Sequence, residues 1–166
     1  MMRLAEILYE DYIGYGTPQE IEVTSDDLEE EHKAMGLFWY QYHTNDERIS
    51  NEGEYNAAKL NDLRHIYYEL YGDLMDEGIL VFLSEYCEQR DGDTIYMSGT
   101  GDFGAVGEFY FDEPNDVVGE DGVLTITGPV MVYSGEDYVP DCLYEVVFTE
   151  HENMPGQYVF ESVKVS

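Results

Sequence analysis

The spacing of apolar residues changes partway along the chain, and this change constrains the fold more than any other feature. Residues 1–90 carry apolar side chains at intervals of three and four, the spacing of helices with one buried face. Residues 91–166 carry short alternating runs separated by Gly, Pro, Asn and Asp, as in strands joined by turns. This order predicts an α+β fold in which N-terminal helices pack on a curved antiparallel sheet of about five to six strands.

The length of 166 residues predicts a single domain over 1–166, with a mainly helical segment at 1–90 and an antiparallel sheet at 91–166. The first helix should end before Gly14. Thr24 and Asp27 form a capping-box pair that predicts the start of the second. Gly72 should close the third helix, and Asp73 should cap the fourth. The expected buried faces are Leu4, Ile7, Leu8 and Tyr12; Leu28, Met35, Trp39 and Tyr42; Leu60, Leu63, Tyr67, Leu70 and Tyr71; and Ile79, Phe82, Leu83 and Tyr86.

Five strands are expected in the second half, near 94–98, 106–111, 123–133, 142–149 and 158–165. Turn signals separate some of them, at Asp91-Gly92, Asp121-Gly122 and Pro155-Gly156. Gly128-Pro129 interrupts the third run, and this predicts that the strand is bulged or lies at an edge.

Acidic residues dominate the charge, with 37 Asp and Glu against 7 Lys and Arg, for a net charge of −30. Such a polyanion repels phosphates, so direct binding of nucleic acid is not expected. A basic protein surface is the complementary partner. The chain is still 43% hydrophobic and 14% aromatic, enough for a folded core. The excess of acids is shared equally between the two halves, and residues 91–163 contain no Lys or Arg.

The sequence gives little indication of a targeting signal or of how its two cysteines pair. No run reaches the roughly 18 apolar residues of a membrane span, and residues 1–15 include Glu6 and Glu10 where a secretory signal would be apolar. The expected location is extracytoplasmic if an export signal has been trimmed and cytoplasmic otherwise. Cys87 and Cys142 match no metal or redox pattern, and they allow one disulfide or two buried thiols. The sequence does not indicate an oligomeric state.

No catalytic motif is found, so an enzyme is not expected, and neither is a cofactor. Residues 99–106 fit the G-x-G-x-x-G-x-V pattern of a kinase glycine-rich loop. However, no Lys follows on a next strand and no His-Arg-Asp loop exists, and a dinucleotide fingerprint would need a helix here. We interpret this segment as a glycine-rich hairpin loop. The four histidines show no H-E-x-x-H spacing for zinc.

Calcium is the metal that so acidic a chain could hold. Residues 91–93 begin like an EF-hand loop, but Tyr96 stands at position six, where glycine is required, and Asp102 at position twelve. Two interpretations stay open, an irregular calcium site or solvated turn residues. The candidate ligands are Asp91, Asp93, Asp112, Glu113 and Asp116.

Aromatic residues are concentrated near positions 38–42, where four rings cannot all point inward on one helix. They either cover the edges of the core with their hydroxyls in water, or form an acid-rimmed contact surface that holds Lys or Arg through cation–π and charge interactions. The candidate partner-binding residues are Phe38, Trp39, Tyr40, Tyr68, Asp102, Glu120, Asp121, Glu136 and Asp137.

A family resemblance covers residues 60–166. It is carried by segments 60–64, 72–75, 82–86, 91–96 and 156–163. These segments resemble the extracytoplasmic domains of Gram-positive bacteria typified by inhibitors of cell-wall DL-endopeptidases. The resemblance implies a helical segment leaning on a curved antiparallel sheet, and a non-catalytic role in binding and blocking a wall hydrolase. It assigns no inhibitory residue.

The leading hypothesis is therefore a non-enzymatic acidic interaction or inhibitor protein that binds a basic surface of a protein partner, with a cell-wall hydrolase as the first candidate. The alternative is a cytosolic DNA mimic of the antirestriction or anti-CRISPR type, which the acid-rich stretch 26–31 supports. A mimic must place carboxylates in an elongated row, because duplex DNA carries one charge per roughly 1.7 Å of its axis.

Overall fold

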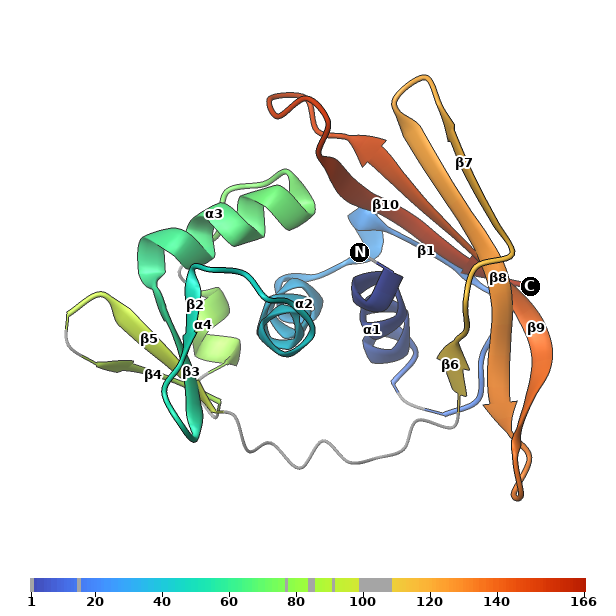
Figure 1. The fold of residues 1–166 in the computed structure, drawn as a ribbon, viewed down its shortest axis with the longest axis horizontal. Helices are drawn as coiled ribbons and strands as arrows, with labels where there is room; N and C mark the ends of the chain where they lie inside the picture. The colour runs from blue at the N-terminus through green and yellow to red at the C-terminus, as the bar shows by residue number, and fades with distance from the viewer. Residues whose placement is uncertain (1, 15, 77, 84–85, 91, 99–108) are drawn as a thin grey trace.

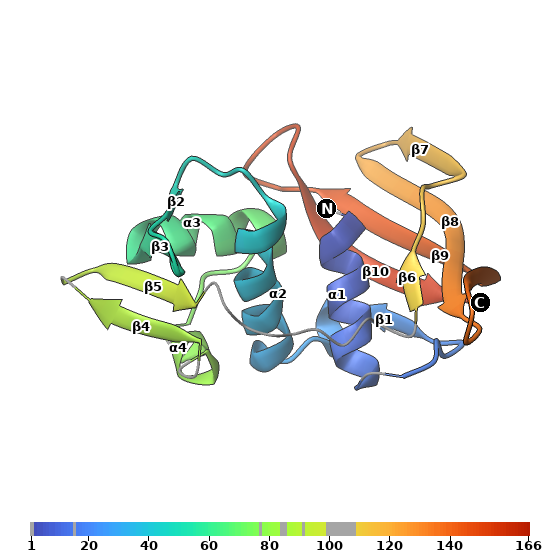
Figure 2. The same ribbon diagram turned by 60° about the horizontal axis from the view of Figure 1, so that its bottom comes forward.

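A large curled antiparallel sheet and a smaller one lie at opposite ends of the molecule, with the helices between them (Figure 1). The computed structural model describes residues 2–14, 16–76, 78–83, 86–90, 92–98 and 109–166. In both views helix α1 (Met2–Ile13) lies beside the large sheet, and α2 (Glu30–His43) lies between α1 and the small sheet (Figure 2). The predicted α+β class and curved antiparallel sheet are confirmed.

The large sheet is antiparallel throughout its described part, in the order β1, β10, β9, β8, β6, and β7 pairs with another part of β8. Its long strands match the alternating sequence runs, and two of them have the expected ends. The strands are β1 (Glu22–Thr24), β6 (Phe109–Phe111), β7 (Asp116–Glu120), β8 (Val123–Tyr133), β9 (Tyr138–Glu150) and β10 (Tyr158–Val165).

The interruption at Gly128-Pro129 is the point where β8 changes its outer neighbour. β6 pairs with residues 130–132 of β8, whereas β7 pairs with residues 123–127. Proline has no N–H to donate to a ladder, so it fits at this gap between partners. The pairing of β8 with β9 shifts register between Val130 and Met131, so the strand is irregular here as predicted, but it lies inside the sheet and not at its edge.

Strand β7 was not expected from the sequence. All five of its residues are exposed, including Val117 and Val118, so it shows no alternation of buried and solvated side chains. The turn that joins it to β8 was predicted. Asp121 and Gly122 have positive φ angles of 49° and 79°, as a two-residue hairpin turn requires.

The smaller sheet corrects the prediction of a mainly helical first half, because three of its strands and β1 come from residues 1–90. These strands are short, and polar or small residues fill most of their positions, so their hydrophobic alternation is weak. The order is β2 (Ile49–Asn51), β3 (Tyr55–Lys59), β5 (Thr94–Ser98) and β4 (Cys87–Arg90), antiparallel throughout.

Helix ends follow the capping signals in part. The third helix, α3 (Leu60–Tyr71), ends at Gly72, whose φ of 75° and N–H bond to the Tyr68 carbonyl make the expected left-handed cap. Thr24 and Asp27 do bond to each other, but they cap a short 3₁₀ turn (Ser25–Asp27), and α2 begins later. Helix α4 (Ile79–Phe82) has a single turn and is preceded by Gly78, so the predicted Asp73 cap is wrong.

Two clusters of buried side chains hold these layers. One joins α1 to the large sheet around Leu8, Tyr9 and Tyr144. The other joins α2, α3 and α4 to the small sheet around Leu63 and Met97. Of the predicted buried face of α2, Leu28 is buried but lies before the helix begins. The prediction is wrong for the helix itself, which is packed on two sides and buries a different stripe. That stripe is Ala34, Leu37, Phe38 and Gln41, whereas Met35, Trp39 and Tyr42 are only partly buried.

Candidate functional site

The predicted aromatic contact surface is only partly exposed. Phe38 has no exposed area, and its ring centroid lies 5.1 Å from that of Tyr86 and 5.5 Å from that of Tyr42. Phe38 is therefore a core residue, and its prediction as a partner contact is wrong. Trp39 and Tyr40 are partly buried and line a cavity of about 270 Å³ between α1 and α2.

The other candidate partner residues are not brought together. Tyr68 is half-buried on α3, and its ring packs edge-on against His151 at 4.6 Å. The remaining acidic candidates occupy two turns at opposite ends of β8 (Figure 1): Glu120 and Asp121 lie at the β7–β8 turn, and Glu136 and Asp137 at the β8–β9 turn. Asp102 lies outside the described residues, as does the glycine-rich motif at 99–106.

The calcium candidates are also separated. Asp93 lies at the β4–β5 turn of the small sheet, where its carboxylate pairs with Lys59 at 3.0 Å. The others lie between β6 and β7 of the large sheet or at the start of β7 (Figure 1), and Asp91 is outside the described residues. No group of three metal-ligating side chains occurs within the described ranges. The structure therefore corrects the proposed set of Asp91, Asp93, Asp112, Glu113 and Asp116, whose described members belong to two different sheets.

An acidic groove of about 470 Å³ lies at the N-terminal end of α2, next to α4. Three consecutive carboxylates, Glu29, Glu30 and Glu31, line one side and are exposed. The first turn of a helix tolerates such a run because its free N–H groups carry partial positive charge. Phe82 of α4 lines the other side with 51% of its surface exposed, and the adjacent Val81 is 71% exposed. The groove thus combines an apolar ring with a row of acids.

Among the described residues that line the acidic groove, the one cation is already paired. The Lys33 ammonium lies 3.1 Å from the Asp73 carboxylate and 5.9 Å from the centroid of the Tyr71 ring. Its side chain is only 16% exposed. Lys33 therefore does little to neutralise the three glutamates.

The pKa of the Tyr67 hydroxyl reflects the negative charge near the acidic groove. Burial raises the pKa of its hydroxyl, and the negative charges of Glu30, Asp73 and Asp76 raise this pKa further. These three acids come from α2 and from the loop that follows α3. The negative charge therefore extends from the acidic groove toward this loop.

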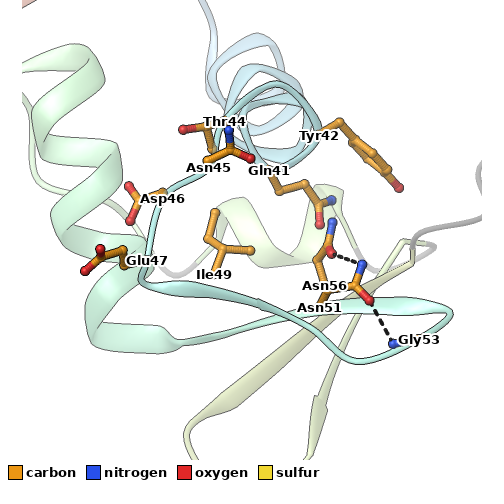
Figure 3. A pocket seen from close by; sticks show the side chains of 10 residues that line it. All are labelled: Gln41, Tyr42, Thr44, Asn45, Asp46, Glu47, Ile49, Asn51, Gly53 and Asn56. Carbon is orange, nitrogen blue, oxygen red and sulfur yellow. Dashed lines mark hydrogen bonds between the residues drawn. The ribbon is translucent and has the colours of Figure 1, made fainter.

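At the other end of α2, a second cavity of about 590 Å³ opens between the helix and the β2–β3 hairpin (Figure 3). We call it the amide pocket, because Gln41, Asn45, Asn51 and Asn56 line it together with Thr44. Asn51 and Asn56 are register partners on adjacent strands, so their side chains share one face of the sheet. The Asn51 amide donates a hydrogen bond of 3.4 Å to the Asn56 carbonyl oxygen.

Gln41 was not singled out from the sequence. It is only 4% exposed, and neither its amide nitrogen nor its amide oxygen has a hydrogen-bond partner among the described residues. A signal was present, because Gln41 follows Leu37 and Phe38 at helical intervals of four and three on the stripe that α2 buries. A polar residue on a buried stripe is the pattern that marks it.

An ion network fixes one side of the amide pocket. The Arg48 guanidinium donates to Asp46 at 2.6 and 2.9 Å and to Glu69 at 2.6 and 2.8 Å. The hydrogen bonds from Arg48 lower the pKa of Asp46 to about 2. The Arg48 backbone N–H also donates to Asp46 at 2.9 Å, and the Tyr40 hydroxyl donates to it at 3.0 Å. Asp46 is therefore paired within the protein, with a cation that it shares with Glu69.

Comparison with protein-family models, curated proteins and solved structures finds no match to this chain. Within its described residues, no helix is both long enough and apolar enough to cross a membrane.

Proposed function

We propose that this chain is a non-enzymatic acidic binding protein whose acidic groove holds a basic segment of a protein partner and occludes it. One observation carries the proposal: Phe82 is 51% exposed beside three exposed glutamates, and among the described residues that line the groove the one cation, Lys33, is paired with Asp73. An exposed ring beside acids is suited to a Lys or Arg that lies beside an apolar residue of the partner.

Electrostatic attraction accounts for the expected binding kinetics. A net charge of −30 on a chain of this size attracts a basic surface over about one Debye length, roughly 10 Å at 0.1 M salt. Such steering raises the association rate and makes it sensitive to salt. The apolar side chains then limit dissociation, because the buried area at the centre of an interface holds the complex together.

The apolar part of the acidic groove favours a protein partner over the role of a DNA mimic. A mimic replaces phosphates with carboxylates and does not need exposed rings in its binding surface. Phe82 lines the acidic groove beside the glutamates and is 51% exposed, which suits an apolar anchor of a partner protein. By resemblance, an extracytoplasmic cell-wall hydrolase is the first candidate, and its blocking would be the biological effect.

Affinity capture with matched variants tests the proposal. The groove variant carries Glu29→Gln, Glu30→Gln, Glu31→Gln and Phe82→Ser. The control removes the same charge and a similar exposed side chain from the large sheet, with Glu113→Gln, Glu120→Gln, Glu136→Gln and Val118→Ser, all at exposed positions. Each variant and the original chain are used to capture proteins from a lysate and from a cell-wall extract, and circular dichroism checks that all three are folded.

The proposal expects a protein that the original chain and the control capture and the groove variant does not. Raising the salt concentration should release it, whereas competing DNA should not. Equal capture by all three proteins would contradict a role for the acidic groove. Release of the partner by DNA would indicate a DNA mimic. Loss of capture in the control alone would indicate that the partner binds the large sheet and not the acidic groove.

A further inference from the structure

The amide pocket lies at the opposite end of α2 from the acidic groove, so an inference about it does not depend on the proposed function. The face of the small sheet that meets α2 is apolar at Ala58 and Met97, which are almost fully buried. Toward the β2–β3 turn this same face changes to Asn51 and Asn56. The hydrophobic core therefore opens at this end into a cavity whose walls carry amides.

Gln41 is the feature that points to a ligand. Its side chain is directed toward the pair formed by Asn51 and Asn56 (Figure 3). Gln41 is almost fully buried, with 4% of its surface exposed, and both polar atoms of its side-chain amide lack a hydrogen-bond partner within the described residues. A buried amide without hydrogen bonds is costly, and an apolar residue of similar size would avoid that cost. Because Gln41 lines a cavity of about 590 Å³, its unpaired amide points to a bound molecule.

The lining of the pocket narrows the class of that molecule. Asp46 is paired with Arg48, which it shares with Glu69, and Glu47 is exposed, so an anion such as a phosphate finds no free cation in the described lining. The groups that remain for a ligand are neutral amides, and each amide offers donors and an acceptor side by side. A hydroxyl group also donates and accepts, and a carbohydrate presents several hydroxyls at close spacing.

We infer that the amide pocket binds a neutral saccharide. The side-chain amide of Gln41 exchanges hydrogen bonds with one sugar hydroxyl. The amides of Asn51 and Asn56 on the sheet form hydrogen bonds with the neighbouring hydroxyls. The ring of Tyr42 borders the pocket and is held by a hydrogen bond from its hydroxyl to the Ser98 carbonyl, so it offers a fixed apolar edge. The cavity volume is within the range of small-ligand sites, large enough for one or two sugar rings.

Titration with saccharides tests this inference. A glycan array with neutral and acidic members selects the best sugar, and that sugar is titrated into the intact chain while two-dimensional NMR spectra follow the side-chain amides. The main variant is Gln41→Met, which keeps the length of the side chain and removes its polar atoms. Gln157→Met is the matched control, because Gln157 is exposed near the β9–β10 turn. Asn56→Ala tests the wall of the pocket.

The expected result is binding of a neutral sugar that shifts the amide signals of Gln41, Asn51 and Asn56. Gln41→Met should weaken binding about tenfold or more, as loss of about 1.4 kcal/mol implies, and should raise the unfolding midpoint of the free protein. Gln157→Met should leave the affinity unchanged, and Asn56→Ala should reduce it.

Four results would overturn the inference. The first is an array without any neutral sugar that binds. The second is equal affinity for the original chain and Gln41→Met. The third is binding of a capped dipeptide amide, used as a probe, in place of every sugar. A clear loss of stability in Gln41→Met would also count against it, because it would show that Gln41 supports the fold itself.

Discussion

Alanine at position 128 should disrupt the centre of the large sheet. A Cβ atom added to Gly128 would lie 2.6 Å from Cζ and 2.9 Å from Cε1 of the Tyr144 ring, closer than real Cβ atoms approach. That ring cannot easily move. Tyr144 has no exposed area, it stacks on Phe111 at 4.6 Å, and its hydroxyl donates a 2.9 Å bond to the Asp112 carbonyl. The change therefore forces either a backbone shift or loss of the tyrosine contacts.

The size of the effect follows from these contacts. Crowding of a packed core costs about 1 to 3 kcal/mol, and loss of the Tyr144 hydrogen bond adds about 0.5 to 1.5 kcal/mol. Gly128 does not have a positive φ, so alanine meets no backbone penalty there. We expect Gly128→Ala to lower the free energy of unfolding by about 2 to 4 kcal/mol.

Urea unfolding followed by circular dichroism measures this change. Gly119→Ala is the matched control on the adjacent strand β7, where the nearest atom to an added Cβ is Leu124 Cδ1 at 3.9 Å. This control should lie within about 1 kcal/mol of the original chain. A second comparison introduces Gly128→Ala together with Tyr144→Leu, which removes the ring.

Two results would refute this reasoning. One is a loss of less than about 0.5 kcal/mol for Gly128→Ala, which is the range of ordinary surface changes. The other is an equal cost of Gly128→Ala with and without the Tyr144 ring, because a clash with that ring requires the two changes to be coupled.

Three further predictions concern ionisable groups. Asp46→Asn should lower the free energy of unfolding by about 1 to 2 kcal/mol at pH 7, a range that allows for the partial exposure of the ion pair. The difference from the original chain should disappear as pH falls from about 4 to about 2, because Asp46 then loses its charge and its ion pair with Arg48. Burial raises the pKa of Glu6, and the ion pair with Arg3 only partly opposes this. Protonated Glu6 therefore stabilises the folded state below its unfolded pKa, and this stabilisation is lost as pH rises through its folded pKa. Glu6→Gln should therefore be more stabilising, relative to the original chain, at pH 7 than at pH 4 in the same urea assay. Burial raises the pKa of Cys87 to about 12, so iodoacetamide should label it at pH 8 far more slowly in the folded protein than in urea.

Strong patterns predicted much of the fold. β5, β8 and β10 have the ends that the sequence indicates. β5 and β8 bury alternate side chains against a core, and β10 does so on either side of a register shift near Ser162. β7 was missed for the opposite reason, since neither of its faces is covered. β2 and β3 were missed because they bring little apolar surface to their sheet.

The candidate site was harder to predict, because it depends on exceptions to the local patterns. Phe82 was expected to be buried with Ile79 and Leu83, but a helix of a single turn cannot turn all its apolar residues inward. Its exposure beside Glu30 requires the packing of α4 against α2, which no local signal specifies. Gln41 stands on the buried stripe of α2, and only the three-dimensional arrangement shows that it lines a cavity.

The affinity between the chain and its captured partner, measured as a function of salt, tests the central claim most directly. Between about 0.05 M and about 0.5 M salt, the dissociation constant should rise at least tenfold, because added ions screen the attraction between the acidic groove and a basic segment. The groove variant should show both weaker binding and a smaller salt dependence. An affinity that stays the same over this range, or that changes equally in the groove variant, would contradict the claim that the acidic groove holds a basic partner.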